Sequence, residues 1–241
     1  MARYYPTEDT FINIARGLVK DTSGEHKFGA TPEISVSQTA TIWDKSDTLY
    51  PWSSFATASI LNVDSSSASD VGESVTIVGL DANFNPQTET VVLTTQTNNN
   101  TTNTFIRVYR AYMSGTTSNV GVISIQVGST DVAVILAGES QTLMAVYTVP
   151  AGYDALITHG AATVKAGSDM TLGMYVRYGG VGAFRIGHQA EISPNGYNYQ
   201  FGVPLRIPEK SDIDIRGRAN SNNIRGTAAW DMILIKKPLG S

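Results

Sequence analysis

The chain of 241 residues contains no cysteine. It can therefore form no disulfide, and it offers neither a thiolate metal ligand nor a cysteine nucleophile. Only three histidines are present (His26, His159 and His188), and no two of them have the close spacing of a metal-binding pair. A zinc site would have to be assembled from distant segments. We therefore expect no metal ion and no cofactor.

Charged residues are also scarce. Lys, Arg, Asp and Glu make up 16% of the chain, and the formal net charge is −4. This balance argues against nucleic acid or an anionic membrane as the main partner. Apolar runs such as Val132–Ala137 fall far short of the roughly 20 residues of a membrane-spanning helix, and the first residues lack the apolar core of a signal peptide. We expect a soluble protein made in a cytoplasm, with no nucleic-acid or membrane partner.

The abundant residues are small and polar. Thr (26), Ser (22) and Asn (14) form about a quarter of the chain, and a hydrophobic fraction of 41% excludes disorder of the whole. Apolar residues alternate with Ser and Thr in segments such as 34–42 and 170–176, and turn residues recur about every 8–12 residues. This period of two, with many β-branched residues, indicates half-buried strands. The sequence therefore predicts an all-β fold of antiparallel β-sandwich or jelly-roll sheets.

The chain is predicted to have three parts. These are an N-terminal arm (residues 1–33), a β-sandwich (residues 34–137) and a jelly-roll-like β domain (residues 138–241). The joint between the two β domains is placed at residues 128–138, because enough strand-like segments lie on each side for a separate sandwich.

The arm allows two interpretations. Phe11, Ile14 and Leu18 have helical spacing, and Thr7 or Thr10 would cap such a helix. The same residues also fit an extended arm, which would need a neighbour to bury Phe11 and Ile14.

Charge is distributed unevenly along the sequence. Residues 21–95 hold ten acids and two bases, whereas residues 177–237 hold nine bases and five acids. Solvated loops would explain this split. It would also suit a molecule with an acidic and a basic end, whose copies pack head to tail.

No catalytic motif is present, and we expect no enzymatic activity. The sequence has neither a nucleophile elbow nor a phosphate-binding loop. Asp212 and Asp214 share one face of a strand, where paired carboxylates could serve acid–base chemistry or bind Ca²⁺. Arg216 and Arg218 continue the same face, so an ion-pair ladder is the favoured interpretation.

Three large aromatic residues, Trp43, Tyr50 and Trp52, lie in one loop. The loop either packs over the edge of a core or supplies a subunit contact or sugar-stacking platform, because aromatic side chains bury a large area at low entropic cost. Asp44 and Asp47 beside these rings are the carboxylates that a polysaccharide-active enzyme would use.

A series of short motifs runs through nearly the whole chain. They are Lys27-Phe28-Gly29, Ile42-Trp43-Asp44, Tyr50-Pro51-Trp52, residues 65–70, 78–81, 89–93, 105–108 and 147–153, and residues 208–213. In this order the motifs resemble a family of virion structural proteins of tailed bacteriophages, of the type found in marine and cyanobacterial phages. The resemblance implies a non-enzymatic protein of the capsid or virion. Segment 94–104 departs from the pattern, since Thr and Asn stand where a glycine turn is expected.

Composition and resemblance together favour a capsid cement, or decoration, protein that stabilises a phage head by bridging capsid subunits. Its expected location is the capsid surface of the virion. Its expected partners are the major capsid protein and further copies of itself, in a homotrimer or a higher assembly. A tail, baseplate or head-fibre component that binds host glycans is the alternative. The residues expected to contact the capsid or sister subunits are Phe11, Ile14, Leu18, Trp43, Tyr50 and Trp52.

Overall fold

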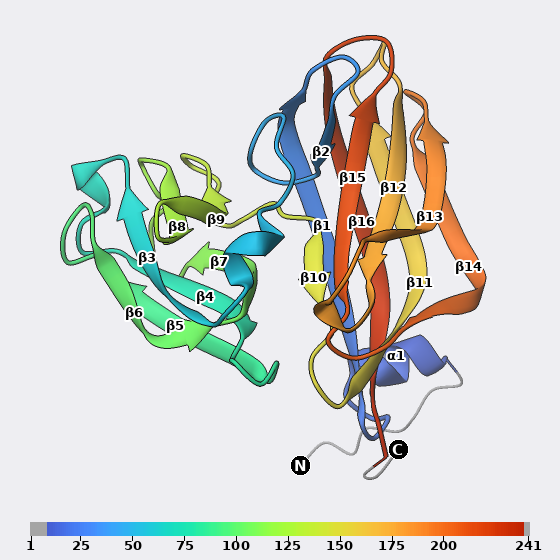
Figure 1. The fold of residues 1–241 in the computed structure, drawn as a ribbon, viewed down its shortest axis with the longest axis horizontal. Coiled ribbons are helices and arrows are strands. Elements are labelled where there is room, and N and C mark those ends of the chain that lie inside the picture. The colour runs from blue at the N-terminus through green and yellow to red at the C-terminus, as the bar shows by residue number, and fades with distance from the viewer. Residues whose placement is uncertain (1–8, 239–241) are drawn as a thin grey trace.

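Short strands with alternating burial make up most of the chain, as their period-two sequences predict. The computed structural model describes residues 9–238, and the predicted all-β fold class is confirmed. The strands form two antiparallel β-sandwiches side by side, which we call the large and the small sandwich (Figure 1). No helix of the described residues is long and apolar enough to cross a membrane.

The large sandwich holds its core between two sheets. Its buried side chains include Ile34, Ile157, Met170, Ile213 and Trp230. One sheet has the order β1-β16-β11-β14, and the other has the order β10-β15-β12-β13, with β2 also paired to β15. The strands are β1 (Thr22–Ile34), β2 (Thr39–Thr41), β10 (Val146–Thr148), β11 (Tyr153–Val164), β12 (Met170–Arg177), β13 (Arg185–Ile192), β14 (Tyr197–Ile207), β15 (Asp212–Ala219) and β16 (Ile224–Lys236).

The small sandwich has its own core, built around Leu61, Ile77, Phe105 and Ile125. Its sheets have the orders β6-β3-β8-β9 and β5-β4-β7. The strands are β3 (Ser59–Ser65), β4 (Ser74–Leu80), β5 (Pro86–Val92), β6 (Asn99–Phe105), β7 (Arg107–Met113), β8 (Ile123–Val127) and β9 (Thr130–Ile135). Short 3₁₀ turns lie at η1 (Trp52–Phe55), η2 (Ala68–Asp70) and, in the large sandwich, η3 (Tyr178–Gly180).

The strand pairing differs from the predicted division of the chain. β1 pairs with β16 from Thr22 opposite Ile235 to Ile34 opposite Ile224, and β2 pairs with β15. Residues 22–34 are therefore a strand of the large sandwich rather than an arm, and the small sandwich is inserted between β2 and β10. The sequence of β1 hides this role, because Gly24, Gly29 and Pro32 interrupt its apolar alternation.

Two further strands were not predicted. β9 lies inside the segment predicted as the joint, and most of β6 lies in the Thr- and Asn-rich segment 94–104, where the resemblance implies a glycine turn. β6 is an edge strand, and its outward positions need no apolar residues because they meet water.

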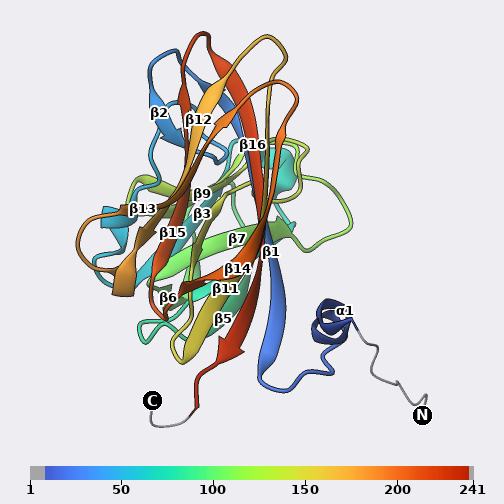
Figure 2. The ribbon, with the colours of Figure 1, turned by 90° about the vertical axis from the view of Figure 1, so that its right-hand side faces the viewer.

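The N-terminal segment is helical over a short stretch, α1 (Thr10–Ala15). Asp9 caps it, because its Oδ1 accepts hydrogen bonds from the backbone N–H groups of Phe11 (2.9 Å) and Ile12 (3.1 Å). The cap is therefore not Thr10, which is the first helical residue, and Thr7 lies outside the described residues. Figure 2 shows α1 standing beside the lower end of β1, which follows it in the chain.

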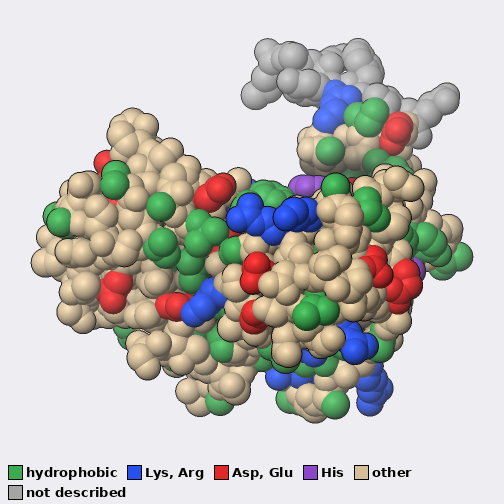
Figure 3. All heavy atoms as spheres, turned by 90° about the horizontal axis from the view of Figure 1, so that it is seen from above, with side chains coloured by type: hydrophobic (Ala, Val, Ile, Leu, Met, Phe, Trp, Pro, Cys, Tyr) green, Lys and Arg blue, Asp and Glu red, His purple; other side chains and the backbone are tan. Residues whose placement is uncertain are grey.

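The predicted charge split does not separate the two sandwiches. The acid-rich residues 21–95 include β1, which lies in the large sandwich together with the base-rich residues 177–237. Figure 3 accordingly shows acidic and basic side chains interspersed on the face in view.

Candidate functional site

Two carboxylates are buried at the boundary between the sandwiches. Asp212 and Asp214 alternate along β15 with Ile213 and Ile215. The isoleucines belong to the core of the large sandwich, and side chains alternate across a strand. Both carboxylates therefore face away from that core, toward the small sandwich. Each Asp is fully buried, and a buried charge is costly without partners, so their contacts define the site.

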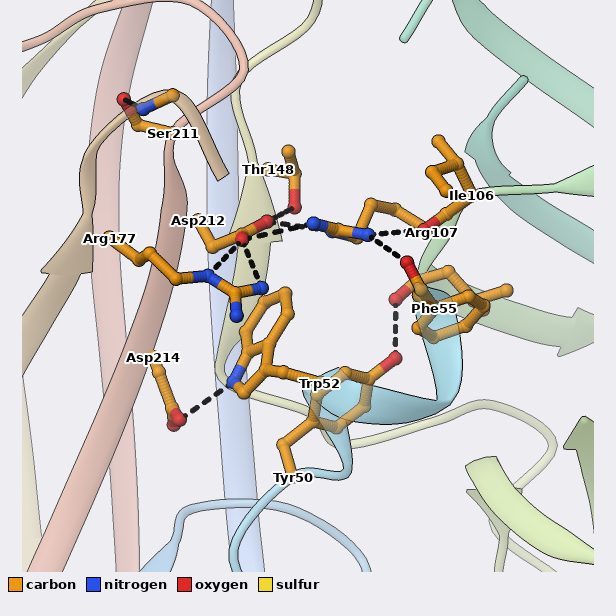
Figure 4. A network of polar contacts seen from close by, with 12 residues as sticks. Tyr50, Trp52, Phe55, Ile106, Arg107, Thr148, Arg177, Ser211, Asp212 and Asp214 are labelled. Carbon is orange, nitrogen blue, oxygen red and sulfur yellow. Dashed lines mark hydrogen bonds and ion pairs between the residues drawn. The ribbon is translucent and has the colours of Figure 1, made fainter. Parts of the chain in front are cut away.

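Arg107 of β7 crosses the boundary from the small sandwich (Figure 4). Its Nε donates to Asp212 Oδ1 at 2.7 Å and its Nη2 donates to Asp212 Oδ2 at 3.1 Å. Its Nη1 donates to the carbonyl oxygens of Ile106 (2.7 Å) and Phe55 (3.2 Å). A guanidinium fork matches a carboxylate in two places, so this pair fixes orientation as well as distance. Arg107 is 4% exposed and links the two sandwiches directly.

The other contacts of Asp212 come from the large sandwich. Arg177 donates to Oδ2 through Nε (2.8 Å) and Nη2 (2.6 Å), and Thr148 Oγ1 donates to Oδ1 at 2.6 Å. Two guanidinium groups therefore share one carboxylate.

Asp214 forms the second half of the site. Its Oδ2 accepts from Trp52 Nε1 at 2.9 Å and from Arg216 Nε at 3.0 Å, and its Oδ1 accepts from Thr41 Oγ1 at 2.8 Å. Trp52 belongs to η1, in the connection that enters the small sandwich. Its ring lies 5.4 Å from the guanidinium carbon of Arg177. We call this set the junction network. It comprises Thr41, Trp52, Arg107, Thr148, Arg177, Asp212, Asp214 and Arg216.

Both carboxylates of the junction network are saturated with hydrogen bonds. Every carboxylate oxygen of Asp212 and Asp214 accepts at least one hydrogen bond from the described residues. A fully satisfied polar network in a low-dielectric interior specifies one arrangement of its surroundings. The network therefore sets the relative orientation of the two sandwiches.

The predicted ion-pair ladder is confirmed for one pair of residues. Arg216 Nη2 lies 2.9 Å from Asp214 Oδ2, as expected from their spacing. Asp212, however, takes its partners from β7 and β12, and Arg218 lies exposed. Sequence reasoning missed Arg107 because its partner is 105 positions away. The available signal was a cation flanked by the apolar residues Ile106 and Val108.

Lys27 makes a second buried contact between the sandwiches. It extends from β1, is 7% exposed, and donates through Nζ to the carbonyl oxygen of Tyr109 on β7. Burial lowers the pKa of Lys27 to about 7, Arg110 adds to this effect, and Glu25 opposes it. The junction therefore contains an amine that titrates near neutral pH.

The three predicted contact aromatics lie in the interior. Trp43, Tyr50 and Trp52 are 1%, 3% and 7% exposed, and their rings pack edge to face against one another. The structure contradicts an exposed contact surface here and agrees with a loop packed over a core edge. The reason is that this loop crosses between the sandwiches, so its rings have neighbours on both sides.

The predicted arm residues divide into two kinds. Phe11 and Leu18 are 56% and 38% exposed, so they are available to a partner. Ile14 is 7% exposed and lies against β1 near Gly24, so it attaches α1 to its own sandwich.

The histidines meet partners on neighbouring strands. His26 Nδ1 lies 2.5 Å from Asp231 Oδ1, and His159 Nδ1 lies 3.4 Å from Asp231 Oδ2. His188 Nε2 lies 2.6 Å from the hydroxyl oxygen of Tyr197. Within residues 9–238, no three His, Cys, Asp or Glu side chains are arranged to hold a metal ion.

Asp44 and Asp47 have different environments. Asp44 is 3% exposed, and its Oδ2 accepts from the N–H of Leu143 at 2.7 Å. Asp47 accepts from the N–H and the hydroxyl of Ser35, and these hydrogen bonds lower its pKa. Because the adjacent aromatic rings are buried, the two carboxylates do not border an aromatic-lined cleft.

No family model and no curated protein matches the chain. Among solved structures, it is similar to VP2 in a subviral particle of infectious bursal disease virus, with a TM-score of 0.23, 11% identity, and coverage of 90% of this chain and 73% of that chain. A structure of T=1 particles derived from the same virus gives a TM-score of 0.19, 11% identity, and coverage of 90% and 70%. Likeness at this level assigns neither a family nor a function.

Proposed function

We propose that this chain is a non-enzymatic structural protein of a virion, and specifically a capsid cement protein of the tailed-phage type. The junction network carries the proposal, because it joins two sandwiches with separate outer surfaces into one two-lobed body. A body of this kind can hold two shell subunits at a fixed separation. The order of short motifs along the chain, which resembles phage virion proteins, supports the same function.

Bridging stabilises a shell by mass action. A protein that binds the assembled shell but not its separated subunits shifts the equilibrium toward assembly. Engaging two subunits through one two-lobed body makes the second contact intramolecular, which raises the effective affinity without new kinds of contact. The major capsid protein is the proposed partner.

The segment around α1 is the proposed anchor. Phe11, Ile12 and Leu18 are 56%, 48% and 38% exposed, although all three are apolar and close in sequence. Neighbouring exposed apolar residues mark interaction sites more often than inert surface. Three copies around a three-fold axis would place three such anchors on equivalent shell positions with one kind of contact, so we propose a homotrimer.

The test combines particle stability with attachment. Particles stripped of this protein should break at a lower temperature than complete particles, and re-addition of the protein should restore the original temperature. The double variant Phe11→Ser and Leu18→Ser should keep its own melting temperature but fail to bind stripped particles. Val203→Ser is the matched control, because Val203 is an apolar residue 84% exposed on β14. Equal stability of stripped and complete particles would overturn the cement function, and normal attachment of the double variant would overturn the anchor.

A tail, baseplate or head-fibre component is a second candidate, favoured by a different aromatic group. Tyr199 on β14 is 41% exposed, stacks on His188 at 4.9 Å, and meets Phe201 edge to face at 4.9 Å. Such rings can stack on sugars. Copy number separates the candidates, because a cement protein occurs in hundreds of copies per particle and a tail component in roughly 3 to 24. Quantitative mass spectrometry of virions measures it, and Tyr199→Ala should abolish glycan binding only under this second function.

A further inference from the structure

Three exposed valines lie at the end of the small sandwich that is remote from the junction network. Val71, Val92 and Val120 are 44%, 50% and 61% exposed. β4 defines the two ends, because its last residue, Leu80, pairs with Arg107 and its first residue pairs with Val92. The seven residues of β4 separate these ends by about 20 Å. The valines therefore lie at the opposite end of the small sandwich from Arg107.

Hydrogen bonds bring the three valines together from different parts of the sequence. The N–H of the residue after Val71 donates to the carbonyl oxygen of the residue after Val92 at 2.8 Å. The N–H of Val120 donates at 2.6 Å to Oδ1 of Asp70, which directly precedes Val71. The chain segments that carry the three valines are therefore in direct contact. We call Val71, Val92 and Val120 the tip patch.

The loops that carry the tip patch are packed together without any partner. Asp70 is 1% exposed, and its Oδ2 accepts from Ser65 Oγ at 2.5 Å and from the N–H of Gly121 at 2.9 Å. A Cβ at Gly121 would lie 2.5 Å from the backbone nitrogen of Ser67, so the two loops approach each other closely. A preformed surface binds without the entropic cost of ordering its loops.

The surroundings of the tip patch favour an apolar partner. Segments 61–73, 91–99 and 113–121 contain no Lys or Arg. Their acids, Asp64, Asp70 and Glu73, each accept a hydrogen bond from a neighbouring loop. An anionic partner would therefore be repelled, and a polar partner would lose water without gaining new hydrogen bonds from the valines. The tip patch fits an apolar surface.

The tip patch is too small to hold two free copies of this chain together. A stable interface buries about 800 Å² on each partner and uses about 20–30 residues from each side. Three partly exposed valines supply only a small part of that area. Such a contact holds when the protein is already bound elsewhere, because the effective concentration of the second site is then in the millimolar range.

We infer that the tip patch binds an apolar surface on a second shell subunit, next to the subunit that the anchor around α1 binds. This inference rests on the proposed function and identifies the contact of the small sandwich that bridging requires. The anchor belongs to the large sandwich and the tip patch to the small sandwich (Figure 1). Because the junction network fixes the two sandwiches, the two contacts are held at a fixed separation.

Binding to stripped particles tests the tip patch. The tip variant carries Val71→Ser, Val92→Ser and Val120→Ser. Its anchor is intact, so it should still bind stripped particles, but with an affinity lowered on the order of 100-fold, because the second contact is lost. It should also fail to restore the temperature at which complete particles break. Analytical ultracentrifugation should show the same oligomeric state for the tip variant and the parent protein.

Two further variants make the test specific. Val120→Asp changes a loop residue and leaves the strands unchanged, so it replaces the tip variant if the triple change prevents folding. It should lower the affinity at least as much. The matched control is a triple serine variant of residues that are 75%, 55% and 84% exposed on the large sandwich. These residues are Val181, Ile186 and Val203. The control should bind and protect particles as the parent protein does.

The possible results separate this inference from the cement function. A tip variant that protects particles as well as the parent protein would overturn the inference alone. A changed oligomeric state would assign the tip patch to a sister copy and would also overturn it. The affinity ratio of parent to tip variant should persist at about 1 M salt, and its collapse would indicate a contact between charges instead. Failure of the parent protein to protect particles would overturn the cement function and this inference together.

Discussion

Arg107 Nε lies 2.7 Å from Asp212 Oδ1, although the two residues belong to different sandwiches and are 105 positions apart. Both are almost entirely buried, and the contact is two-pronged. The connection between the sandwiches is therefore an ordered interior and not a flexible linker, and its energetics can be tested one residue at a time.

Removing Arg107 should destabilise the whole protein. In Arg107→Ala, Asp212 keeps Arg177 but loses a bidentate partner in a site closed to water. Breaking a buried pair in this way costs about 3–5 kcal/mol. Urea unfolding measures the loss. Arg206→Ala is the matched control, because Arg206 forms a similar 2.7 Å pair with Asp154 but its side chain is 65% exposed. That change should cost less than about 1 kcal/mol. Equal losses of unfolding free energy in the two variants would show that the buried pair stabilises the protein no more than the exposed pair does.

A methyl group at Gly79 should disrupt the small sandwich. A Cβ there would lie 2.0 Å from the carbonyl oxygen of Arg107, which is backbone and cannot turn away. Gly79→Ala should therefore destabilise the protein by about 2–3 kcal/mol or prevent folding of the small sandwich. Gly160→Ala is the control, since Gly160 also lies in a strand but has nothing within 4 Å of the corresponding position. It should be neutral or slightly stabilising in thermal unfolding. The prediction fails if the two alanine variants have the same melting temperature.

The stability of the protein should depend on the titration of Lys27. Its pKa is lowered to about 7 in the folded chain, whereas an unfolded lysine titrates near 10.5. Between these values the unfolded state binds more protons, so the free energy of unfolding should rise with pH, by roughly 3 kcal/mol from pH 7 to 9.5. Measurement stops at pH 9.5 because Tyr50, Tyr109 and Tyr147, whose pKa values are raised by burial, oppose the trend at higher pH.

Lys27→Met isolates this contribution. The variant should lose the rise in unfolding free energy above pH 7 while keeping the remainder of the pH profile. Chemical denaturation at several pH values gives both curves. Parallel curves for the variant and the parent protein would exclude Lys27 as the titrating group.

Asp44 should act in the opposite direction and at lower pH. Its pKa is raised from 3.8 to about 7, chiefly by burial. In this window the folded state binds more protons, so the contribution of Asp44 to the free energy of unfolding is greatest below pH 4 and is lost as pH rises through 7, by at most about 4 kcal/mol. Asp44→Asn should flatten this decline between pH 4 and 7, and differential scanning calorimetry at several pH values measures it. A slope unchanged by the substitution would show that Asp44 is ionised throughout.

Much of the fold follows from local sequence. The clean alternation of residues 170–176 predicts β12 (Met170–Arg177), because burial on one face dictates the pattern. The sequence does not predict β1, since two glycines and a proline break its pattern and its partner β16 lies at the other end of the chain. The glycine at position 29 is needed there, because a Cβ would lie 2.4 Å from the backbone nitrogen of Ala145.

The candidate site was harder to predict than the strands. The spacing of Asp214 and Arg216 along one strand is local information, and that pair was predicted. The partnership of Arg107 with Asp212, and the burial of Trp43 and Trp52, depend on how two sandwiches meet, which no periodicity encodes. Charged residues between apolar neighbours in a strand are the sign that such a meeting surface exists.

The pairing of β1 with β16 imposes an order on synthesis of the protein. Thr22 stands opposite Ile235, so this sheet cannot close until nearly the whole chain has left the ribosome. The small sandwich, by contrast, forms its ladders within residues 59–135 and can fold while the remainder is still being translated. β1 therefore stays unpaired while the later strands are synthesised. The pairing of β1 with β16 is the expected rate-limiting step of folding, because long-range pairs form slowly. Nascent chains that have exposed β9 outside the ribosome but not yet β16 would carry a finished small sandwich beside an unfinished sheet, the state in which chaperones are most needed.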